Sequence, residues 1–446
     1  MFYFYLVFTL YLLFPNYSFS NEIYFPPLNG DQWETSSPES LEWCESEIDP
    51  LLQFLEENNT KAFIVLKDGK IVIEKYFDNF TQDSTWYWAS AGKTITSFLI
   101  GLAKQNNFLS LSDKSSDYLG EKWTNLTKNK EDLITIRNQL TMTTGLNDGV
   151  KDNDCTIDTC LIYLQDAGKR WAYHNAPYTL FDNVIENSTG DKLNIFLYKY
   201  LNQFIGMKGA FFKIGFNNFY ISKSRDMARF GLLMLNGGNW NGNQIMTDTK
   251  YYNDMINTSQ EINESYGYLW WLNGKDFYML PGLQTIFNGS ISPDAPADMY
   301  SALGLNSQIL NIVPSQNLIT IRMGDIAEIE GGLVPYILNN NIWKKLNKVI
   351  CNIKSVDISK KNNKYKVNIY PNPAQNQINI DLSTINKKIP SLPFQVKIYN
   401  SLGSKIIDKL INPNSPIDIL YLDKGVYSVL VTINGINYST KFVVIK

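Results

Sequence analysis

Helical spacing of apolar residues is the clearest local pattern in this chain. Behind the aromatic run 86–88, apolar side chains recur at i, i+3, i+4 and i+7, which places them on one face of an α-helix that begins near residue 90. The residues of this stripe are Ile95, Phe98, Leu99 and Leu102. Similar patterns predict helices at residues 42–58, 134–146, 224–234 and 334–349, and a helical stretch that ends at 186–190.

Strand-like segments lie on both sides of these helices. Residues 63–66 and 71–74 are β-type runs joined by the turn 67–70, which predicts a β-hairpin. Alternating patterns predict further strands at 266–272, 303–313 and 317–323. A hairpin first, helices in the middle, then strands and a final helix are typical of an α+β domain. We therefore expect one antiparallel sheet flanked by helices, on which both ends of the domain meet, plus a helical region.

The two ends of the chain differ from this central region. Residues 1–14 are almost wholly apolar, and small residues follow at the positions that a signal peptidase reads, which predicts a signal peptide. The apolar run is shorter than the roughly 20 residues that span a bilayer, so no transmembrane segment is expected in the mature chain. A polar, lysine-rich segment is typical of a linker, and the β-type runs after it predict a small all-β sandwich. The expected parts are a signal peptide at 1–20, a main domain at 21–353, a linker at 354–366 and a β-sandwich at 367–446.

Composition narrows the possible chemistry. The net charge of -3 argues against nucleic acid as a partner. With His174 as the single histidine, a Ser-His-Asp triad could use only that residue, and a histidine-rich zinc site cannot be built. The four cysteines form no Cys-x-x-Cys pair, so a thiolate metal site is not expected. We expect no cofactor and no metal.

The cysteines are expected to form disulfides. A signal peptide leads to an oxidising compartment, where paired thiols are oxidised. Cys155 and Cys160 are separated by four residues and can close a tight loop ahead of residue 173. Cys44 and Cys351 would join the first predicted helix of the main domain to the last.

The sequence Ser90-Ala91-Gly92-Lys93 is the first candidate for chemistry. It is the only Ser-x-x-Lys in the chain, and it opens a predicted helix, so the hydroxyl and the amine lie one turn apart on the same face. A serine becomes a nucleophile when a neighbouring base removes its proton, and a partly buried lysine can be that base. From these four residues alone, an N-cap serine followed by an exposed lysine is the alternative.

A second candidate is Tyr173-x-Asn175, which lies in a segment too irregular for a core helix. On an extended segment, alternate side chains point the same way, so Tyr173 and Asn175 would share a face and His174 would take the opposite one. A tyrosine beside a lysine can pass a proton between nucleophile and leaving group. The asparagine amide can hold a substrate carbonyl or the lysine, while His174 is expected to be structural.

Together these motifs resemble the serine β-lactamase-like hydrolases, which include class C β-lactamases, D-stereospecific peptidases and related esterases. The resemblance covers roughly residues 61–348. It rests on motifs that occur in the family's order: Ser90-x-x-Lys93, the sequence of residues 141–146, Tyr173-x-Asn175, the sequence of residues 224–228, and Gly304 at the start of a late strand.

The resemblance implies a role for each matching position. Ser90 would be the acylated nucleophile, Lys93 with Tyr173 the proton-transfer pair, and Asn175 a substrate-binding residue. The family's third motif falls on residues 302–304, which implies that Gly304 and Leu305 bind substrate and that the Leu305 N–H completes an oxyanion hole with that of Ser90. The family commonly has a cation where this chain has Ala302, which cannot hold the carboxylate of a β-lactam or a peptide.

The last 80 or so residues resemble the C-terminal sorting domain of the type IX secretion system of Bacteroidetes-type bacteria. The matching segments are residues 369–374, 396–403 and 422–429. The resemblance implies a secreted or cell-surface protein that is exported through the periplasm and whose partner is the type IX machinery. An accessory sandwich that binds carbohydrate is the alternative.

Three functions are consistent with these patterns. The first is a secreted serine hydrolase of a small-molecule ester, amide or peptide. The second is a penicillin-binding or β-lactamase-type protein that β-lactams or D-amino-acid peptides acylate. The third is a catalytically inactive surface-binding protein. The set Ser90, Lys93 and Tyr173 favours an enzyme, and Ala302 favours the first function over the second.

Overall fold

The computed structural model describes two separate units of the chain, which divide between Cys351 and Asn352. The described residues are 23–329, 332–351, 367–382, 393–399, 405–413, 415–433 and 436–445. The predicted signal peptide at 1–20 and the predicted linker at 354–366 lie outside the described residues.

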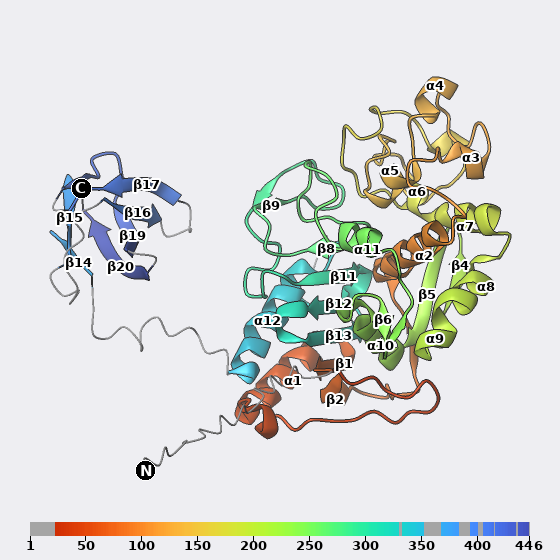
Figure 1. Ribbon diagram of the computed structural model, residues 1–446, viewed down its shortest axis with the longest axis horizontal. Coiled ribbons are helices and arrows are strands. Elements are labelled where there is room, and N and C mark those ends of the chain that lie inside the picture. The colour runs from red at the N-terminus through yellow and green to blue at the C-terminus, as the bar shows by residue number, and fades with distance from the viewer. Residues whose placement is uncertain are drawn as a thin grey trace, which may run out of the picture. The chain divides into compact units, whose positions relative to one another are not determined.

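The first unit is built on a six-stranded antiparallel sheet in the order β2-β1-β13-β12-β11-β8. Figure 1 shows this sheet between two groups of helices. Its strands are β1 (Thr60–Lys67), β2 (Lys70–Tyr76), β8 (Trp271–Leu272), β11 (Tyr300–Gly304), β12 (Gln308–Val313) and β13 (Leu318–Gly324). Because β1 pairs with β13, the two ends of the unit meet on one sheet, as the sequence predicts.

The predicted hairpin is confirmed as β1 and β2. Asp68 and Gly69 form its turn with φ of 50° and 84°, the left-handed backbone that a tight two-residue turn requires. An added Cβ at Gly69 would lie 2.0 Å from the carbonyl oxygen of Tyr24, so only glycine fits beneath the N-terminal segment.

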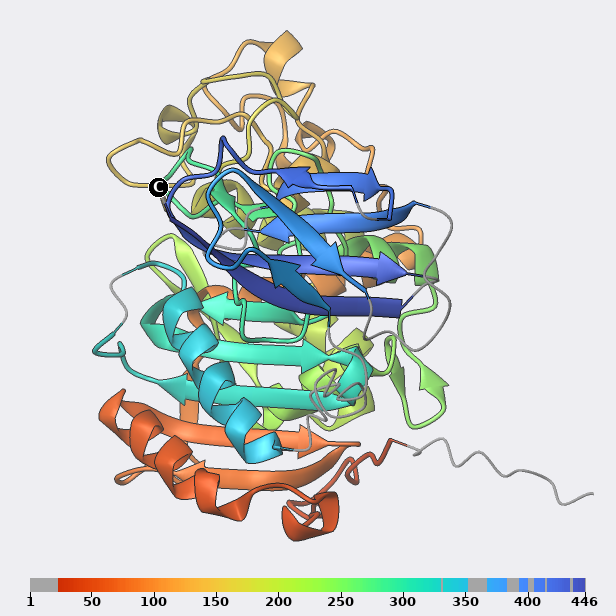
Figure 2. The same ribbon diagram turned by 90° about the vertical axis from the view of Figure 1, so that its left-hand side faces the viewer.

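Helices cover both faces of the sheet. The helices α1 (Ile48–Glu57) and α12 (Tyr336–Ile350) pack together on one face, as Figure 2 shows. On the other face α10 (Ser224–Leu235) packs against β12 and β13. An added Cβ at Gly231 would lie 3.0 Å from the side chains of Leu310 and Ile319, so α10 lies directly on the strands.

The middle of the first unit's sequence forms a helical region. It comprises α2 (Lys93–Gln105), α3 (Ser116–Leu119), α4 (Lys128–Glu131), α5 (Ile136–Leu140), α6 (Asn175–Thr179), α7 (Phe181–Thr189), α8 (Leu193–Leu197) and α9 (Gln203–Ile205). The predicted stripe of α2 is fully buried, and α7 ends at Gly190 with φ of 76°. A three-stranded sheet, β3 (Thr85–Tyr87), β5 (Asn217–Lys223) and β4 (Ala210–Ile214), lies beside it. Among the described residues, no helix is both long and apolar enough to cross a membrane.

Two predicted strands are wrong in extent. The segment 303–313 is not one strand but parts of β11 and β12, because Asn306 and Ser307 adopt φ of 57° and 63° and reverse the chain. Of the segment 266–272, only β8 is a strand, and Leu269 with φ of 64° interrupts the extended backbone. Apolar alternation predicts burial on one face, and it does not reveal such a reversal.

Two predicted helices are shorter than expected. In the segment 42–58, α1 starts only at Ile48, because Cys44 has an extended backbone and Pro50 belongs in a first turn, where its missing N–H costs nothing. In the segment 134–146, α5 ends at Leu140, since Met142 has φ of 56° and cannot continue a helix.

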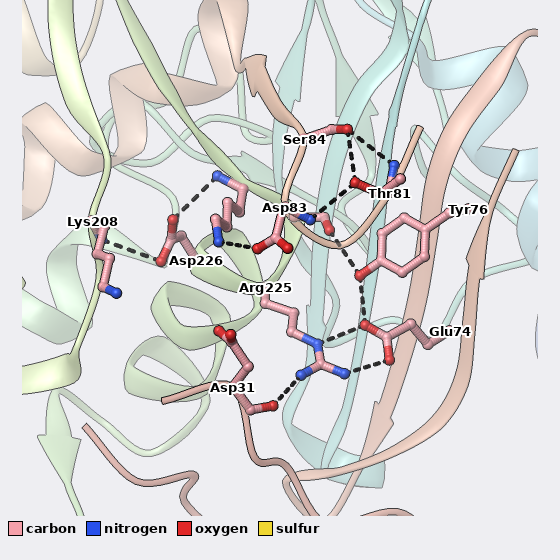
Figure 3. A network of polar contacts seen from close by, with 11 residues as sticks. Asp31, Glu74, Tyr76, Thr81, Asp83, Ser84, Lys208, Arg225 and Asp226 are labelled. Carbon is pink, nitrogen blue, oxygen red and sulfur yellow. Dashed lines mark hydrogen bonds and ion pairs between the residues drawn. The ribbon is translucent and has the colours of Figure 1, made fainter. Parts of the chain in front are cut away.

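A polar network fixes the start of α10 to the edge of the hairpin (Figure 3). The Arg225 guanidinium donates to both carboxylate oxygens of Glu74 in β2, each at 2.7 Å, and to the backbone oxygen of Asp31 at 2.5 Å. The carboxylate of Asp226 accepts the backbone N–H of Lys223 at 3.1 Å. This network explains the polar residues within the 224–228 motif: they join β2, the N-terminal segment and the end of β5.

The second unit is all-β, as predicted. Its strands form two antiparallel sheets, in the orders β14-β15-β18 and β17-β16-β19-β20. The strands are β14 (Asn368–Tyr370), β15 (Gln377–Asp381), β16 (Phe394–Tyr399), β17 (Lys405–Ile411), β18 (Ile417–Asp418), β19 (Gly425–Ile433) and β20 (Ile436–Val444). Buried residues of both sheets form one core, so this unit has a core of its own.

Both predicted disulfides are present. Cys44–Cys351 has a Cα–Cα distance of 5.7 Å and joins residues 307 positions apart, next to α1 and at the end of α12. Cys155–Cys160 closes a loop with a sequence separation of 5. The first bond therefore closes almost the whole first unit, and the second closes one local turn.

We expect the Cys44→Ser/Cys351→Ser variant to lose about 3 kcal/mol more unfolding free energy than the Cys155→Ser/Cys160→Ser variant, because a longer loop constrains the unfolded chain more. Denaturant unfolding of the first unit measures both. Equal losses would contradict the loop-length explanation.

Candidate active site

Ser90 lies in a 3-10 turn, Ala89–Gly92, that leads directly into α2. The turn follows Trp88, which is fully buried: its backbone N–H donates to Tyr220 O at 2.8 Å and its indole N–H to Ser222 Oγ at 2.9 Å. Ala89 has φ of 47°, a conformation that costs energy for a residue with a side chain. The anchored tryptophan on one side and the helix on the other hold this turn, which leaves Ser90 only partly covered.

Lys93 lies next to Ser90, with Nζ 3.1 Å from Ser90 Oγ. The side chain is buried, and its amine faces the rings of Tyr173 and Tyr178, with 5.2 and 4.2 Å between Nζ and the ring centroids. Burial lowers the pKa of Lys93 to about 7, and the negative charge of Asp154 opposes this shift. Near neutral pH a large fraction of the amine is therefore uncharged and able to accept a proton from Ser90.

Tyr173 completes this group from the other side. Its ring packs among Trp171, Tyr266 and Trp271, with centroid distances of 6.4, 6.2 and 5.9 Å. Burial raises the pKa of Tyr173, and a hydrogen bond with Ser90 opposes the rise. The phenol is thus protonated at neutral pH.

Asn175 is the first residue of α6, so the expectation of an extended segment through residue 175 is wrong. Its side-chain Nδ2 donates to Asp154 Oδ1 at 2.8 Å, and its backbone N–H donates to Asn153 Oδ1 at 3.1 Å. Asn175 Oδ1 is buried and has no hydrogen-bond partner among the described residues.

The expectation that Gly304 starts a strand is wrong: it is the last residue of β11, because the chain reverses at residues 306 and 307. The end of β11 lies against the Ser90 turn. A Cβ added at Gly304 would lie 2.4 Å from Trp88 O and 3.1 Å from the Ser90 backbone nitrogen. Residue 304 therefore must be glycine for the strand to approach the turn this closely. Leu305 follows as the first residue after the strand, and its side chain is 42% exposed.

Ala302 is fully buried in β11 and shares a sheet face with Gly304, since alternate residues of a strand point the same way. It provides no charge on the face that approaches Ser90.

His174 is buried next to the site, and neither of its ring nitrogens has a hydrogen-bond partner among the described residues. Burial lowers the pKa of His174 to about 4, so the ring is neutral at physiological pH.

Sequence reasoning missed two residues of this group. Tyr178, which faces Lys93, lies three positions after Asn175, and a helix at 175–179 would have placed the two on one face. Asp154, which accepts a hydrogen bond from the Asn175 side chain, belongs to no recognisable motif. The sequence feature that could have drawn attention to it is its position beside Cys155.

Two family models match the chain. A family model described as Beta-lactamase matches residues 55–324, and one described as Secretion system C-terminal sorting domain matches residues 368–446. No curated protein matches the sequence.

Solved structures of low sequence identity have a similar fold. A Bacillus anthracis protein proposed to be a 6-aminohexanoate-dimer hydrolase is 18% identical, with a TM-score of 0.54 over 73% of this chain and 89% of its own. A Bacteroides dorei protein proposed to be a beta-lactamase is 15% identical, with a TM-score of 0.55 over 70% of this chain and 100% of its own. A family VIII carboxylesterase is 12% identical, with a TM-score of 0.52 over 70% of this chain and 98% of its own.

We expect Gly304→Ala to lower the free energy of unfolding by about 1–3 kcal/mol, because the new methyl group would overlap the backbone of residues 88–91. Gly149→Ala is the control, since Gly149 is exposed and its nearest neighbour is a side-chain oxygen 3.2 Å from the added Cβ. Denaturant unfolding compares the two, and equal stability would show that β11 does not depend on glycine at residue 304.

Proposed function

This chain belongs to the beta-lactamase family, and on that basis we propose that it hydrolyses an ester or an amide through an acyl-enzyme on Ser90. Its secretion system C-terminal sorting domain indicates export, with the protein secreted or held at the cell surface. Such a domain implies interaction with the type IX secretion machinery.

The observation that carries this proposal is the 3.1 Å contact between Lys93 Nζ and Ser90 Oγ within a buried, aromatic environment. In the proposed reaction, the neutral amine takes the Ser90 proton as Oγ attacks the substrate carbonyl. Tyr173 passes a proton to the leaving group, and water then releases the acyl group from Oγ with the same residues acting in reverse.

The proposed oxyanion hole consists of the backbone N–H groups of Ser90 and Leu305. The close approach of Gly304 to the Ser90 nitrogen supports it, because that contact brings the end of β11 next to the nucleophile. Asn175 and Gly304 would contact the substrate beside this hole.

The proposed substrate is a small ester, amide or peptide that does not require a cation for its carboxylate. Ala302 supports this choice, since a buried methyl group stands where the family commonly has a cationic residue. The first alternative is a penicillin-binding or β-lactamase-type protein that β-lactams or D-amino-acid peptides acylate. The second alternative is a catalytically inactive surface-binding protein.

We expect Ser90→Ala to abolish labelling by a fluorophosphonate probe and to lower kcat/KM on a p-nitrophenyl ester by about 10³-fold or more. Ser112→Ala is the control, because Ser112 is an exposed serine whose side chain, in the part of the chain that the structure describes, hydrogen-bonds with the neighbouring Ser110. Labelling of the Ser90→Ala protein at the wild-type rate would overturn the assignment of the nucleophile.

The same assay separates the alternatives. Wild-type turnover of p-nitrophenyl esters or simple amides, with little turnover of a chromogenic cephalosporin or D-amino-acid amides, is the expected result. The reverse preference would favour the β-lactamase-type function, and absence of labelling would favour an inactive binding protein.

We propose that the two units separate chemistry from export. A chain that covers residues 21–352 retains Cys351 for its disulfide and the complete core of the first unit, so we expect it to fold and to keep its kcat/KM on a p-nitrophenyl ester. In a host with the type IX machinery, deletion of residues 367–446 should leave active enzyme in the periplasm. If the 21–352 chain unfolds cooperatively but is inactive, the tail contributes to the active site. If the chain without residues 367–446 is released normally into the medium, the tail is not needed for export.

A further inference from the structure

The disulfide-closed loop Cys155–Cys160 is preceded by a segment that contacts the first turn of α6. Asn153 makes these contacts: its Oδ1 accepts the Asn175 N–H at 3.1 Å and its backbone oxygen accepts the Ala176 N–H at 3.2 Å. Its own Nδ2 donates to Asp148 O at 2.9 Å. The segment therefore satisfies backbone donors that a helix start leaves open.

Asp154, the next residue, binds the side chain of Asn175 rather than its backbone. The contact is 2.8 Å between Asn175 Nδ2 and Asp154 Oδ1. An ionised carboxylate only accepts hydrogen bonds, so it selects the amide orientation in which Nδ2 faces Asp154. The free group of Asn175 is then Oδ1, which is buried and has no partner among the described residues.

We propose that Asp154 is a positioning residue of the active site, which fixes the Asn175 amide so that Oδ1, an acceptor, is left for the reacting groups, and which places a negative charge near Lys93. This inference rests on the proposed hydrolase function and deepens it. Asn175 then serves the site as an acceptor for an N–H group and does not donate to a substrate carbonyl.

Lys93 is buried among uncharged groups, so the negative charge of Asp154 affects its pKa. The amine faces Ser90 and the uncharged rings of Tyr173 and Tyr178, and Asp154 raises the Lys93 pKa against the effect of burial. The neighbouring groups are uncharged or act at one remove: Asp182, whose pKa burial raises to about 7, raises the pKa of Tyr178, and His174 is neutral.

The sign of the effect on catalysis follows from the role of Lys93 as a base. The amine is active when neutral, so kcat/KM rises with pH through the Lys93 pKa of about 7. Removing the negative charge of Asp154 makes the protonated amine less stable. The acidic limb of the pH profile should therefore move to lower pH.

Three variants of the full chain test the proposal. Asp154→Ala loses both hydrogen bond and charge, and we expect kcat/KM on a p-nitrophenyl ester to fall by about tenfold or more at the pH optimum. Asp154→Asn keeps an acceptor oxygen and loses only the charge, so it should retain more activity while its acidic limb moves to lower pH. Asp158→Asn is the matched control, an exposed acid in the adjoining disulfide loop whose carboxylate accepts the Thr159 N–H of that loop, and it should behave as wild type.

A double variant distinguishes positioning from a general loss of structure. If Asp154 acts through Asn175, Asp154→Ala should cause little further loss of kcat/KM at the pH optimum in an Asn175→Ala background. Any of three results would overturn the inference. They are additive losses in the double variant at the pH optimum, wild-type activity of Asp154→Ala, and an acidic limb that does not move in Asp154→Asn. Absence of fluorophosphonate labelling in the wild-type chain would instead overturn the proposed function, so the two failures are distinguishable.

Discussion

Burial of the Lys93 amine beside Ser90 Oγ is the constraint on which the site depends. An ammonium group removed from water costs several kcal/mol unless it is paired, and no ion pair with Lys93 occurs among the described residues. The rings of Tyr173 and Tyr178 and the negative charge of Asp154 compensate only in part, so the amine has a lowered pKa. The neighbouring segments must therefore exclude water while leaving Ser90 partly exposed.

The rest of the first unit holds that arrangement in place. The Ser90 turn connects the buried Trp88 to the helix α2. Trp88 is held by hydrogen bonds to β5. The end of β11 closes one side of the turn, which the missing side chain of Gly304 makes possible. Arg225 ties the start of α10, which directly follows β5, to the hairpin edge at Glu74.

Covalent bonds act at two scales in the same unit. Cys44–Cys351 joins segments next to the helices α1 and α12, which cover one face of the sheet, and so fixes the two ends of the unit to each other. Cys155–Cys160 is local, and the residue before it contacts Asn175. Both suit an exported protein, whose thiols meet an oxidising environment.

Local pattern alone determined a large part of this protein. The stripe of α2, the Asp68-Gly69 turn, the helix α10 and the β-type tail each follow from the spacing of apolar and turn residues, and the lone Ser-x-x-Lys singled out Ser90 and Lys93. The pairing of the four cysteines followed from their spacing and from the expected order of elements. These features depend on neighbours within a few residues or on a simple count, which a sequence displays directly.

Tertiary structure decided what depends on contacts between distant segments. Left-handed residues at 306 and 307 divide the segment 303–313 into two strands, and apolar alternation is the same on both sides of that reversal. The burial of Lys93, the contribution of Tyr178 and the bond from Asp154 to Asn175 arise because the helix α6 packs against α2 and the loop before Cys155 contacts α6. A charge state set by burial is a property of the packed environment, so it exists only once the chain has folded.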